Sequence, residues 1–470
     1  MDKRTPPEKI FKSYDIRGVY PSEINEEFAI PIIKAIYKLV SDQLGTTKSL
    51  KFAVGRDMRL SSPAIFKAIS ETLIELGAEV IDLGIVSTPT FYYAVFKSGY
   101  DGGVQITASH NPKEYNGIKI VRKSPTGLVK IGKSTGMDDI KRMSIDGVDA
   151  SKVAGGSITK KDGVVVEEVE NALKIAGNPK LSNYKIVADA ANALGALYIE
   201  ELFKHIPGEL IKMNFELDGT FPVHQADPLQ AETLVDLQKR VLEEKADLGL
   251  APDGDGDRLF FIDEKGKIVP PTIITSLVAK ELLKKHKGAT ILGDIRYIMT
   301  PKKIVEELGG TFVITKVGHA FITEKMHETG GIFAGESSAH YFFKETGNAE
   351  SQLPMILTVL KVMTEEGKSL SQIASEIKRS HESGETNFRV KNAPEIIDVL
   401  KKEFVEGQLN ELDGIAITFA DWRLSVRTSN TEPLLRLNIE AEADGIVEEK
   451  KKKVVELINK HAVFEEGPSH

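Results

Sequence analysis

Short apolar runs alternate along this chain with stretches in which apolar residues recur every three to four positions. Residues 51–55 form such a run and predict a buried strand, whereas Ile65, Ile69, Leu73 and Leu76 predict one face of a helix. Because strands and helices that alternate in this way build parallel sheets covered by helices, the pattern predicts an α/β fold.

Capping residues mark both ends of this first helix. Ser61 and Ser62 can cap its N-terminus, Pro63 suits the first helical position, and Gly77 can end the helix. A second strand is then expected over residues 78–83.

The same order of elements returns twice, and each of the three units ends in a strand that runs into a polar loop. The expected strands are 102–107 in the first unit, 184–189, 210–214 and 246–251 in the second, and 290–293, 311–315 and 331–334 in the third. The expected helices are 195–205 and 233–244 in the second unit and 302–308 and 320–328 in the third. The loops are 108–112, 252–258 and 335–340. Since ligands bind at the carboxyl ends of strands in open α/β sheets, we expect the three loops to face one cleft.

Residues from about 380 onward differ, with strands expected at 386–390, 414–419 and 434–440 and a closing helix at 446–460. Candidate boundaries lie at 151–162, 263–266 and 379–384. The sequence therefore predicts three successive mixed α/β domains with doubly wound sheets plus a smaller C-terminal α+β domain, around a central cleft. The four domains would cover residues 1–155, 156–264, 265–379 and 380–470.

Composition narrows the class of protein. The 470 residues carry 61 Lys and Arg against 69 Asp and Glu, a net charge of −8, which lacks the basic balance typical of nucleic-acid binders. The charged run 448–453 pairs Glu and Lys four residues apart beside an apolar stripe at Val447, Val454 and Ile458, which favours a solvated helix face. The chain has no Cys, residues 1–18 contain no apolar stretch long enough for export, and no run is near the roughly 20 apolar residues that cross a bilayer. We therefore expect a cytoplasmic protein that binds neither nucleic acid nor membrane.

The strongest chemical signal is Asp253-Gly254-Asp255-Gly256-Asp257-Arg258. In an extended chain, residues i, i+2 and i+4 face the same side, so the three carboxylates are expected to converge, and the glycines let the backbone fold tightly. Such hard oxygen ligands suit Mg²⁺. A calcium EF-hand is the rival, but Arg258 stands where that loop requires Gly, and residues 259–262 predict a strand.

Three further loops carry candidate chemistry. In Thr107-Ala108-Ser109-His110-Asn111-Pro112, Ser109 is either a turn residue or, facing a metal, a phosphate carrier, and no G-x-S-x-G elbow surrounds it. Residues 427–433 (R-T-S-N-T-E-P) are dense in donors that suit phosphate, although a polar hairpin turn is the alternative. Residues 335–340 (G-E-S-S-A-H) offer groups for sugar hydroxyls and an imidazole that can move protons, unless that His is simply packed.

Together these motifs resemble the α-D-phosphohexomutase family, in its phosphomannomutase and phosphoglucomutase branch. The resemblance covers essentially the whole chain, in the order Y-D-I-R-G (14–18), T-A-S-H-N-P, D-G-D-G-D-R, G-E-x-S-x-H and R-x-S-N-T-E-P. It implies an isomerase of carbohydrate metabolism that interconverts mannose 1-phosphate and mannose 6-phosphate, with Mg²⁺ as cofactor and hexose 1,6-bisphosphate as activator. Glucose phosphates as the main substrates, a metal-dependent sugar phosphatase and a silent sugar-phosphate-binding protein remain alternatives.

The resemblance also implies roles for single residues. Ser109 would carry the phosphoryl group and hold Mg²⁺ together with Asp253, Asp255 and Asp257. The catalytic residues would be Ser109, Lys119, His340, Arg17 and His110, with Lys119 or His340 as the general base. The substrate-binding residues would be Tyr14, Arg258, Arg296, His319, Glu336, Ser338, Arg427, Ser429, Asn430 and Thr431. Ala339 replaces a Gly found in many members and Ser337 a frequent Met, which disfavours glucosamine phosphate as substrate.

Overall fold

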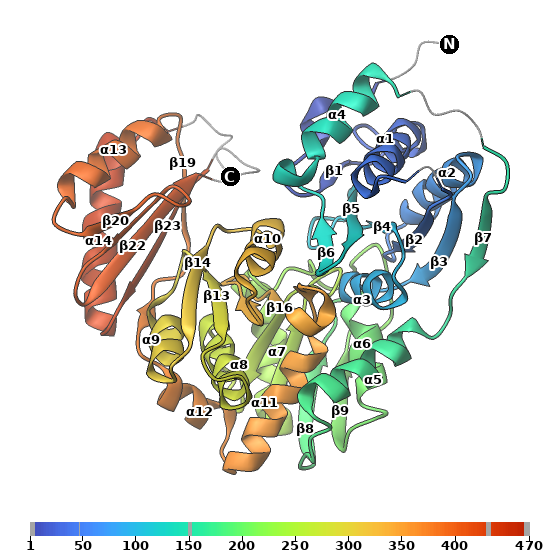
Figure 1. Cartoon of the computed structure of the whole chain (residues 1–470). Coiled ribbons are helices and arrows are strands. Elements are labelled where there is room, and N and C mark those ends of the chain that lie inside the picture. The colour runs from blue at the N-terminus through green and yellow to red at the C-terminus, as the bar shows by residue number, and fades with distance from the viewer. Residues whose placement is uncertain (1–4, 47, 149–152, 429–433, 465–470) are drawn as a thin grey trace. The chain divides into compact units, whose positions relative to one another are not determined.

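The computed structural model describes residues 5–46, 48–148, 153–428 and 434–464. The chain divides into two compact units. Unit one consists of Met1–Pro270 and Ser338–Ile373, and unit two consists of Pro271–Ser337 and Ala374–His470. The α/β fold expected from the sequence is confirmed. The candidate site residues are carried by sheets with helices packed on them (Figure 1).

The first sheet of unit one is mixed, with strand order β1-β5-β4-β2-β3-β7 and β6 paired to β5. Strands β2, β3, β4 and β7 pair parallel, whereas β5 runs antiparallel to β1, β4 and β6. Its strands are β1 (Ile16–Val19), β2 (Lys51–Arg56), β3 (Glu79–Ile85), β4 (Gly102–Ile106), β5 (Tyr115–Ser124), β6 (Gly127–Lys130) and β7 (Ser157–Lys160). The helices that accompany it are α1 (Glu26–Leu44), α2 (Ser62–Glu75), α3 (Thr88–Ser98) and α4 (Met137–Asp146).

Helix α2 corrects one detail of the sequence interpretation. The helix begins at Ser62, so Pro63 is its second residue, and Ser61 stands at the N-cap without a capping side-chain hydrogen bond. The two serines have other partners: Ser62 Oγ donates to Asp57, and Asn116 donates to both hydroxyls. These serines therefore connect the loop after β2 to strand β5 instead of capping the helix.

The second sheet of unit one has the order β12-β11-β10-β8-β9, with β8, β9 and β10 parallel and β11 and β12 antiparallel. Its strands are β8 (Tyr184–Asp189), β9 (Gly208–Met213), β10 (Leu248–Pro252), β11 (Leu259–Asp263) and β12 (Ile268–Val269). The accompanying helices are α5 (Val164–Ala176), α6 (Gly195–Leu202) and α7 (Val235–Glu244), and the later part of the unit adds β16 (Tyr341–Phe343), β17 (Ala349–Glu350) and α11 (Leu353–Glu366). The helix expected over 233–244 begins as a 3₁₀ turn, Ala231–Leu234, before α7. Helix α12 (Leu370–Ile377) carries the chain from unit one into unit two.

Unit two opens with parallel strands in the order β14-β13-β15. The elements of this part are α8 (Pro271–Lys285), β13 (Thr290–Asp294), α9 (Met299–Glu307), β14 (Thr311–Thr315), α10 (His319–Thr329) and β15 (Phe333–Gly335). Gly335 packs so closely on α8 that a Cβ there would lie 2.0 Å from Thr275 Oγ1. The loop predicted to bind sugar therefore starts at a position that only glycine fills without displacing the helix.

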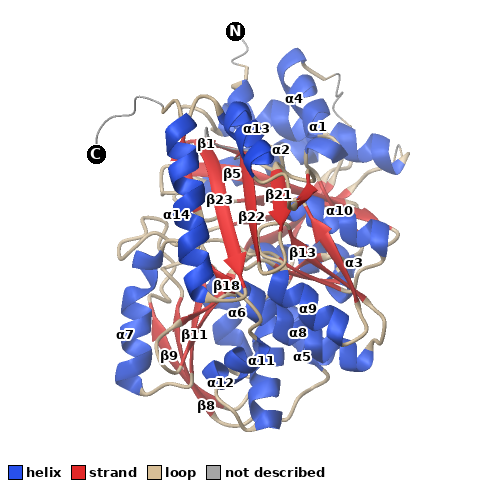
Figure 2. Ribbon diagram, turned by 90° about the vertical axis from the view of Figure 1, so that its left-hand side faces the viewer, coloured by secondary structure: helices blue, strands red, loops and turns tan. Residues whose placement is uncertain are grey.

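The C-terminal part of unit two is an antiparallel sheet with two helices. The sheet order is β18-β23-β22-β21-β20, with β19 also paired to β23. Its elements are β18 (His381–Glu382), β19 (Thr386–Arg389), α13 (Ala393–Glu403), β20 (Gln408–Asn410), β21 (Ile415–Thr418), β22 (Trp422–Thr428), β23 (Leu434–Ala441) and α14 (Asp444–His461). Val447, Val454 and Ile458 of α14 belong to the core formed with the sheet, as the apolar stripe predicted, and Figure 2 shows α14 running beside β23.

Strand β22 was missed in the sequence. The interpretation of residues 427–433 as one loop is wrong at its start, because Arg427 and Thr428 are the last two residues of β22. Arg427 consequently takes its position from cross-strand pairing with Arg436 of β23.

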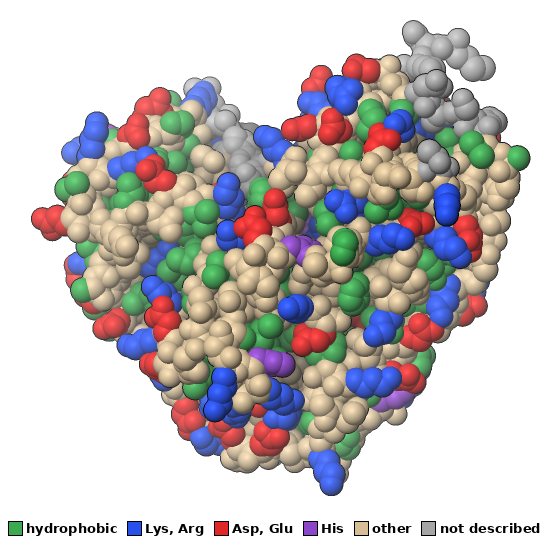
Figure 3. Space-filling model, in the orientation of Figure 1, with side chains coloured by type: hydrophobic (Ala, Val, Ile, Leu, Met, Phe, Trp, Pro, Cys, Tyr) green, Lys and Arg blue, Asp and Glu red, His purple; other side chains and the backbone are tan. Residues whose placement is uncertain are grey.

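No helix in the described part of the chain is long and apolar enough to span a bilayer. Acidic and basic side chains are interspersed over the face of the molecule drawn in Figure 3, in keeping with the modest net charge of −8.

Candidate active site

Two of the predicted loops meet in unit one. The Ser109 loop follows β4, and the Asp253–Asp257 loop follows β10, so both stand at the carboxyl ends of parallel strands, as expected of an α/β ligand site. Ser109 Oγ donates to Asp253 Oδ2 at 2.9 Å. The serine and the acidic loop, separated by more than 140 residues of sequence, are therefore in direct contact.

The three aspartates converge as predicted, but by a different route. One carboxylate oxygen from each of Asp253, Asp255 and Asp257 lies within 4.8 Å of the others, and all three side chains are buried. The loop is a turn and not the extended chain expected, and Gly256 has a φ of +76°, a left-handed conformation that suits glycine. The convergence therefore depends on a tight turn at Gly256.

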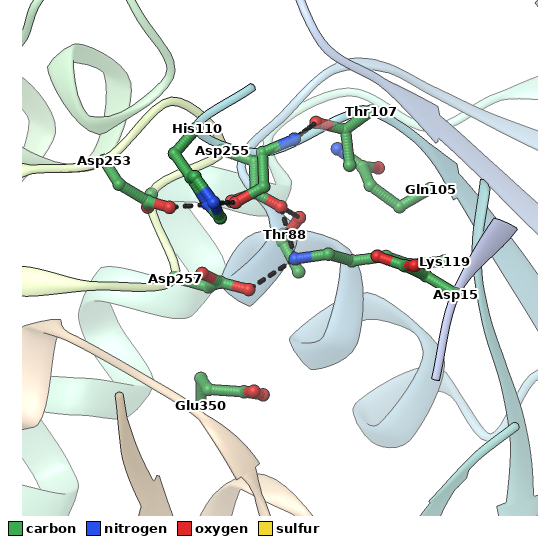
Figure 4. Close-up of polar contacts among 12 residues, drawn as sticks. Asp15, Thr88, Gln105, Thr107, His110, Lys119, Asp253, Asp255, Asp257 and Glu350 are labelled. Carbon is green, nitrogen blue, oxygen red and sulfur yellow. Dashed lines mark hydrogen bonds and ion pairs between the residues drawn. The ribbon is translucent and has the colours of Figure 1, made fainter. Parts of the chain in front are cut away.

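Lys119 of β5 partly neutralises this acidic group. Its Nζ lies 2.6 Å from Asp255 Oδ2 and also pairs with Asp257 Oδ2, while Thr88 Oγ1 donates to Asp255 Oδ2 at 2.6 Å (Figure 4). Burial favours the neutral amine, but the two carboxylates outweigh it and raise the pKa of Lys119 above its usual range. Lys119 is therefore a firmly held cation.

The pKa values of Asp253 and Asp257 are shifted in opposite directions. Burial and the charges of Asp257 and Asp255 raise the pKa of Asp253 to about 8. Although burial opposes ionisation of Asp257 too, Lys119 and His340 hold the pKa of that carboxyl well below its usual range. The acidic group therefore has less positive charge around it than three carboxylates need, and the shortage is greatest at Asp253.

Ser109 has an unusual backbone conformation for a residue that is not glycine, with a φ of +52°. Its N–H donates to Thr107 Oγ1 at 2.9 Å, and its Oγ also lies 3.1 Å from His110 Nδ1. Burial and the nearby cations Arg258 and Arg17 lower the pKa of His110 well below its usual range, so the imidazole is neutral. Positive φ at a non-glycine residue is costly and is often found where function requires a side chain to be aimed.

The third predicted loop contributes His340 and Ser338 to the same group in unit one. His340 Nε2 lies 3.1 Å from Asp257 Oδ1, and its Nδ1 lies 3.1 Å from Ser338 Oγ. Arg258 donates from its backbone N to Asp253 Oδ1 at 3.1 Å and from its Nε to His340 Nε2 at 3.4 Å. His340 thus has polar contacts on both ring nitrogens, and it is not simply packed among aromatic residues.

The N-terminal motif reaches this site through Arg17 of β1. Arg17 donates to Asn111 in the Ser109 loop and to Asp15, and its Nε is buried without a hydrogen-bond partner. Tyr14 lies two residues before β1 and is half-buried. Unit one therefore brings together Ser109, His110, Lys119, Arg258, His340, Arg17 and the three aspartates.

The other predicted substrate-binding residues lie in unit two, where they form a separate network. Arg296 Nε donates to Asp294 at 2.8 Å, and Arg296 Nη2 lies 3.4 Å from Glu336 Oε1. The same Glu336 oxygen accepts from the backbone N of Gly318 at 2.9 Å, next to His319, the buried first residue of α10. Arg296, Glu336 and the Gly318–His319 turn are thus held together after β13, β15 and β14.

Arg427 lies in the same unit, within a cluster of cations. Its Nη2 is 3.6 Å from Glu385, which also pairs with Arg436 at 3.1 Å. Its Nε is buried without a hydrogen-bond partner, and burial together with the charge of Arg296 lowers the pKa of Arg427. The predicted partners Ser429, Asn430 and Thr431 lie outside the described residues.

Sequence reasoning missed several residues of the site. Thr88, the first residue of α3, donates to Asp255, and Gln352, just before α11, donates to the carbonyl of Asp257. Arg59, after β2, is buried against the Ser109 loop. The polar residues within 56–62, directly after the predicted strand 51–55, were the available signal for Arg59, because they match the strand-end placement of the other loops.

The donor set suits Mg²⁺. Asp255 Oδ1 is buried and has no hydrogen-bond partner, and the shortage of positive charge at Asp253 is of the sign that a cation would relieve. Three carboxylate oxygens with a serine Oγ beside them match the hard oxygen ligands that Mg²⁺ takes in proteins. A site that can hold a divalent cation beside a serine hydroxyl, with lysine, arginine and histidine side chains close by, is typical of enzymes that transfer phosphoryl groups.

Comparison with known proteins places the chain within this class. Four family models match it in order: phosphoglucomutase/phosphomannomutase alpha/beta/alpha domain I over residues 8–131, domain II over 166–266, domain III over 270–380, and the C-terminal domain over 385–457. The chain belongs to the phosphoglucomutase/phosphomannomutase family. It is therefore a phosphohexomutase, an isomerase of carbohydrate metabolism, as the sequence motifs implied.

Individual relatives agree. The chain is 38% identical over 454 residues to a phosphomannomutase of Methanocaldococcus jannaschii, covering 96% of this chain and 98% of that protein. It is 36% identical over 460 residues to a phosphomannomutase of Vibrio cholerae, with the same coverage. A phosphoglucomutase/phosphomannomutase family protein from Burkholderia thailandensis superposes with a TM-score of 0.86 at 29% identity, over 97% of this chain and 99% of that one.

Proposed function

We propose that this enzyme interconverts mannose 1-phosphate and mannose 6-phosphate through phosphoserine at position 109 and a hexose bisphosphate, and that it also acts on glucose phosphates. The observation that carries this proposal is the contact between Ser109 Oγ and Asp253 Oδ2, 2.9 Å, beside an Asp255 oxygen that has no partner. A hydroxyl in that position can accept a phosphoryl group and return it. We infer mannose phosphates as the substrates because the relatives are named phosphomannomutases.

Ser109, Asp253, Asp255 and Asp257 would hold Mg²⁺, which would neutralise charge that builds up on the transferring phosphoryl group. The chain supplies cations of its own around the serine. Lys119 stays charged between Asp255 and Asp257, and Arg17 and Arg258 lie close enough to His110 to lower its pKa. In this proposal these three cations orient the phosphoryl group and lower its negative charge.

The proton of the attacking sugar hydroxyl needs an acceptor. Lys119 is a poor base in this structure, because its two carboxylate partners raise its pKa above the usual range. We therefore assign the general base to His340, whose two nitrogens contact Asp257 and Ser338, and leave charge stabilisation to Lys119. Neutral His110, whose Nδ1 is 3.1 Å from Oγ, is proposed to accept the Ser109 proton once that hydroxyl no longer donates to Asp253.

The other predicted substrate-binding residues are assigned from the family resemblance. Tyr14, His319, Glu336 and Ser338 are proposed to contact sugar hydroxyls. Arg427 and Arg296, together with Ser429, Asn430 and Thr431, are proposed to bind the phosphate that does not react. The buried Nε of Arg427, which has no hydrogen-bond partner, supports an anion there.

Three further expectations from the sequence belong to this proposal. The chain would fold as four domains over residues 1–155, 156–264, 265–379 and 380–470, in general agreement with the extents of the four family models. A hexose 1,6-bisphosphate would activate enzyme that has lost its phosphoryl group. The absence of Cys fits a cytoplasmic location.

The test is product formation from mannose 1-phosphate, with and without glucose 1,6-bisphosphate as primer. We expect mannose 6-phosphate, a lag that the primer removes, and phosphate on the Ser109 peptide by mass spectrometry. Ser109→Ala should lose activity by several orders of magnitude. Release of inorganic phosphate in place of mannose 6-phosphate would identify a phosphatase, and binding without turnover would identify a silent sugar-phosphate-binding protein.

A further inference from the structure

The guanidinium group of Arg59 is enclosed by the loop that carries Ser109. Arg59 is 1% exposed, and its four Nη hydrogens reach four backbone carbonyls, three in that loop and one at Tyr115, the first residue of β5. Nη2 donates to the carbonyls of Ser109 at 2.9 Å and Asn111 at 2.6 Å, and Nη1 donates to those of Pro112 at 2.6 Å and Tyr115 at 3.0 Å. Since Nε donates to Asp57 at 3.0 Å, all five guanidinium N–H groups have an acceptor.

Asp57 fixes this arginine in turn. Its carboxylate accepts from the Arg59 backbone N at 3.0 Å and from Ser62 Oγ at 2.6 Å, besides the contact with Nε. The Phe221 ring lies over the guanidinium, 5.1 Å from it. Arg59 is thus a buried, paired cation whose donors are all occupied, so it has no free N–H for substrate or phosphate.

The backbone of Ser109 is hydrogen-bonded at both its N–H and its carbonyl. The Ser109 N–H is bound by Thr107 Oγ1 and its carbonyl by Arg59 Nη2, so the left-handed residue is held from both sides. Gly254 also packs against that carbonyl, since a Cβ on Gly254 would lie 2.4 Å from the oxygen. The loop carbonyls face Arg59 and accept hydrogen bonds from its guanidinium group. The Ser109 side chain points to Asp253.

We propose that Arg59 is a positioning residue for the phosphoryl-carrying serine: it holds the loop from Ser109 to Tyr115 so that Ser109 Oγ faces the aspartates, without touching substrate. The inference rests on the proposed function, because it assigns Arg59 a part in phosphoryl transfer through Ser109. Only arginine offers five donors in a fixed plane. A lysine has three donors, so it would leave at least one of these carbonyls without its partner.

The test compares Arg59→Lys with the wild type in three measurements: kcat and KM for mannose 1-phosphate, the fraction of enzyme phosphorylated on Ser109 by glucose 1,6-bisphosphate, and the thermal midpoint. We expect kcat per phosphorylated site to fall about tenfold to a hundredfold, since a misplacement of order 1 Å has such effects. KM should stay within about twofold, because Arg59 does not contact substrate. Arg56→Lys is the control, since Arg56 ends the same β2 strand in a half-buried ion pair with Asp82, and it should match the wild type.

The readouts separate positioning from a structural role. If Arg59 only stabilised the fold, Arg59→Lys would lower the thermal midpoint and the phosphorylated fraction, but kcat per phosphorylated site would equal that of the wild type. That result would overturn the proposal. If Arg59→Lys does not fold, Asp57→Asn decides, because it removes the carboxylate that fixes the Arg59 guanidinium. An unchanged kcat per phosphorylated site in Asp57→Asn would then overturn the proposal, and a several-fold fall with unchanged KM would support it.

Failure of the proposed function would look different. A wild-type enzyme that takes no phosphate on Ser109 from glucose 1,6-bisphosphate would overturn the phosphoserine route itself, before any Arg59 variant is measured.

Discussion

Asp255 has two carboxylate oxygens with different surroundings. Oδ2 accepts from Thr88 and pairs with Lys119, whereas Oδ1 is buried without a hydrogen-bond partner. A buried unpaired oxygen is costly unless a ligand compensates it, which is the physical reason to place a cation there. Three aspartates in sequence indicated the metal, but only the structure shows which oxygen is available for it.

Asp255→Asn should therefore impair metal binding more than folding. We expect a Mg²⁺ affinity that is at least tenfold weaker and a kcat that is at least a hundredfold lower, because an amide supplies no charge and Lys119 keeps Asp257 as partner. Isothermal titration with Mg²⁺ and kinetics across Mg²⁺ concentrations measure both. Chelator should abolish wild-type activity and Mg²⁺ should restore it, while exposed Asp236→Asn should behave as wild type. An Asp255→Asn enzyme with unchanged Mg²⁺ affinity would contradict the assignment.

Between elements, a buried acid connects helices α3 and α5. Glu168 of α5 is 3% exposed and accepts from Thr90 Oγ1 of α3 at 2.6 Å. Burial outweighs that hydrogen bond and raises the pKa of Glu168 from 4.5 to about 7. The folded protein therefore holds this proton more tightly than the unfolded chain does, and the stabilising effect is lost as the pH rises from about 4.5 to about 7.

Glu168→Gln should remove this pH dependence, because the amide resembles the protonated acid. At pH 5 the free energies of unfolding of variant and wild type should be close, and at pH 8 the variant should be more stable by up to about 3 kcal/mol. Urea unfolding at the two pH values measures the difference, and Glu170→Gln, exposed on the same helix, is the matched control. A constant difference between Glu168→Gln and wild type at both pH values would refute the argument.

Helices and strands could be predicted from the sequence where only one of their faces is apolar. The strands 51–55 and 184–189 and the stripe of α14 were confirmed, since burial of one face leaves a periodic pattern. Helix α11 was missed because it is buried around most of its circumference and has no stripe. Strand β22 was also missed, although Leu424 and Val426 alternate with Arg423, Ser425 and Arg427, and that period of two was the signal that could have found it.

At the scale of the whole molecule, the property to measure is the preference of the enzyme for mannose 1-phosphate over glucose 1-phosphate. Mannose and glucose phosphates differ in the orientation of one hydroxyl, and one hydrogen bond contributes roughly 0.5–1.5 kcal/mol. We therefore expect kcat/KM for mannose 1-phosphate to be at least equal to that for glucose 1-phosphate, with the two within about tenfold. Parallel assays with glucose 1,6-bisphosphate as primer measure the ratio, and glucosamine 1-phosphate should be a poor substrate. A preference for glucose of a hundredfold or more would make phosphoglucomutase the main activity.

The sequence alone determined the family and the order of the motifs, and it predicted Asp253, Asp255 and Asp257 as metal ligands and Ser109 as phosphoryl carrier. These are local features: each motif is contiguous, and its chemistry depends on residue types a few positions apart. Even the wrong detail, an extended aspartate loop in place of a turn, left the ligand set unchanged.

Only the tertiary structure decided which distant groups meet those motifs. Lys119 lies between Asp255 and Asp257 across more than 130 residues, and Arg59 binds carbonyls of the Ser109 loop about 50 residues away. The sequence can mark Lys119 and Arg59 as candidate site residues, but it does not show which groups they contact, because burial and pairing depend on which strands lie side by side in a sheet. For the same reason the protonation of Lys119, His110 and Glu168 could not be predicted, since a pKa reflects the charges and desolvation that packing creates.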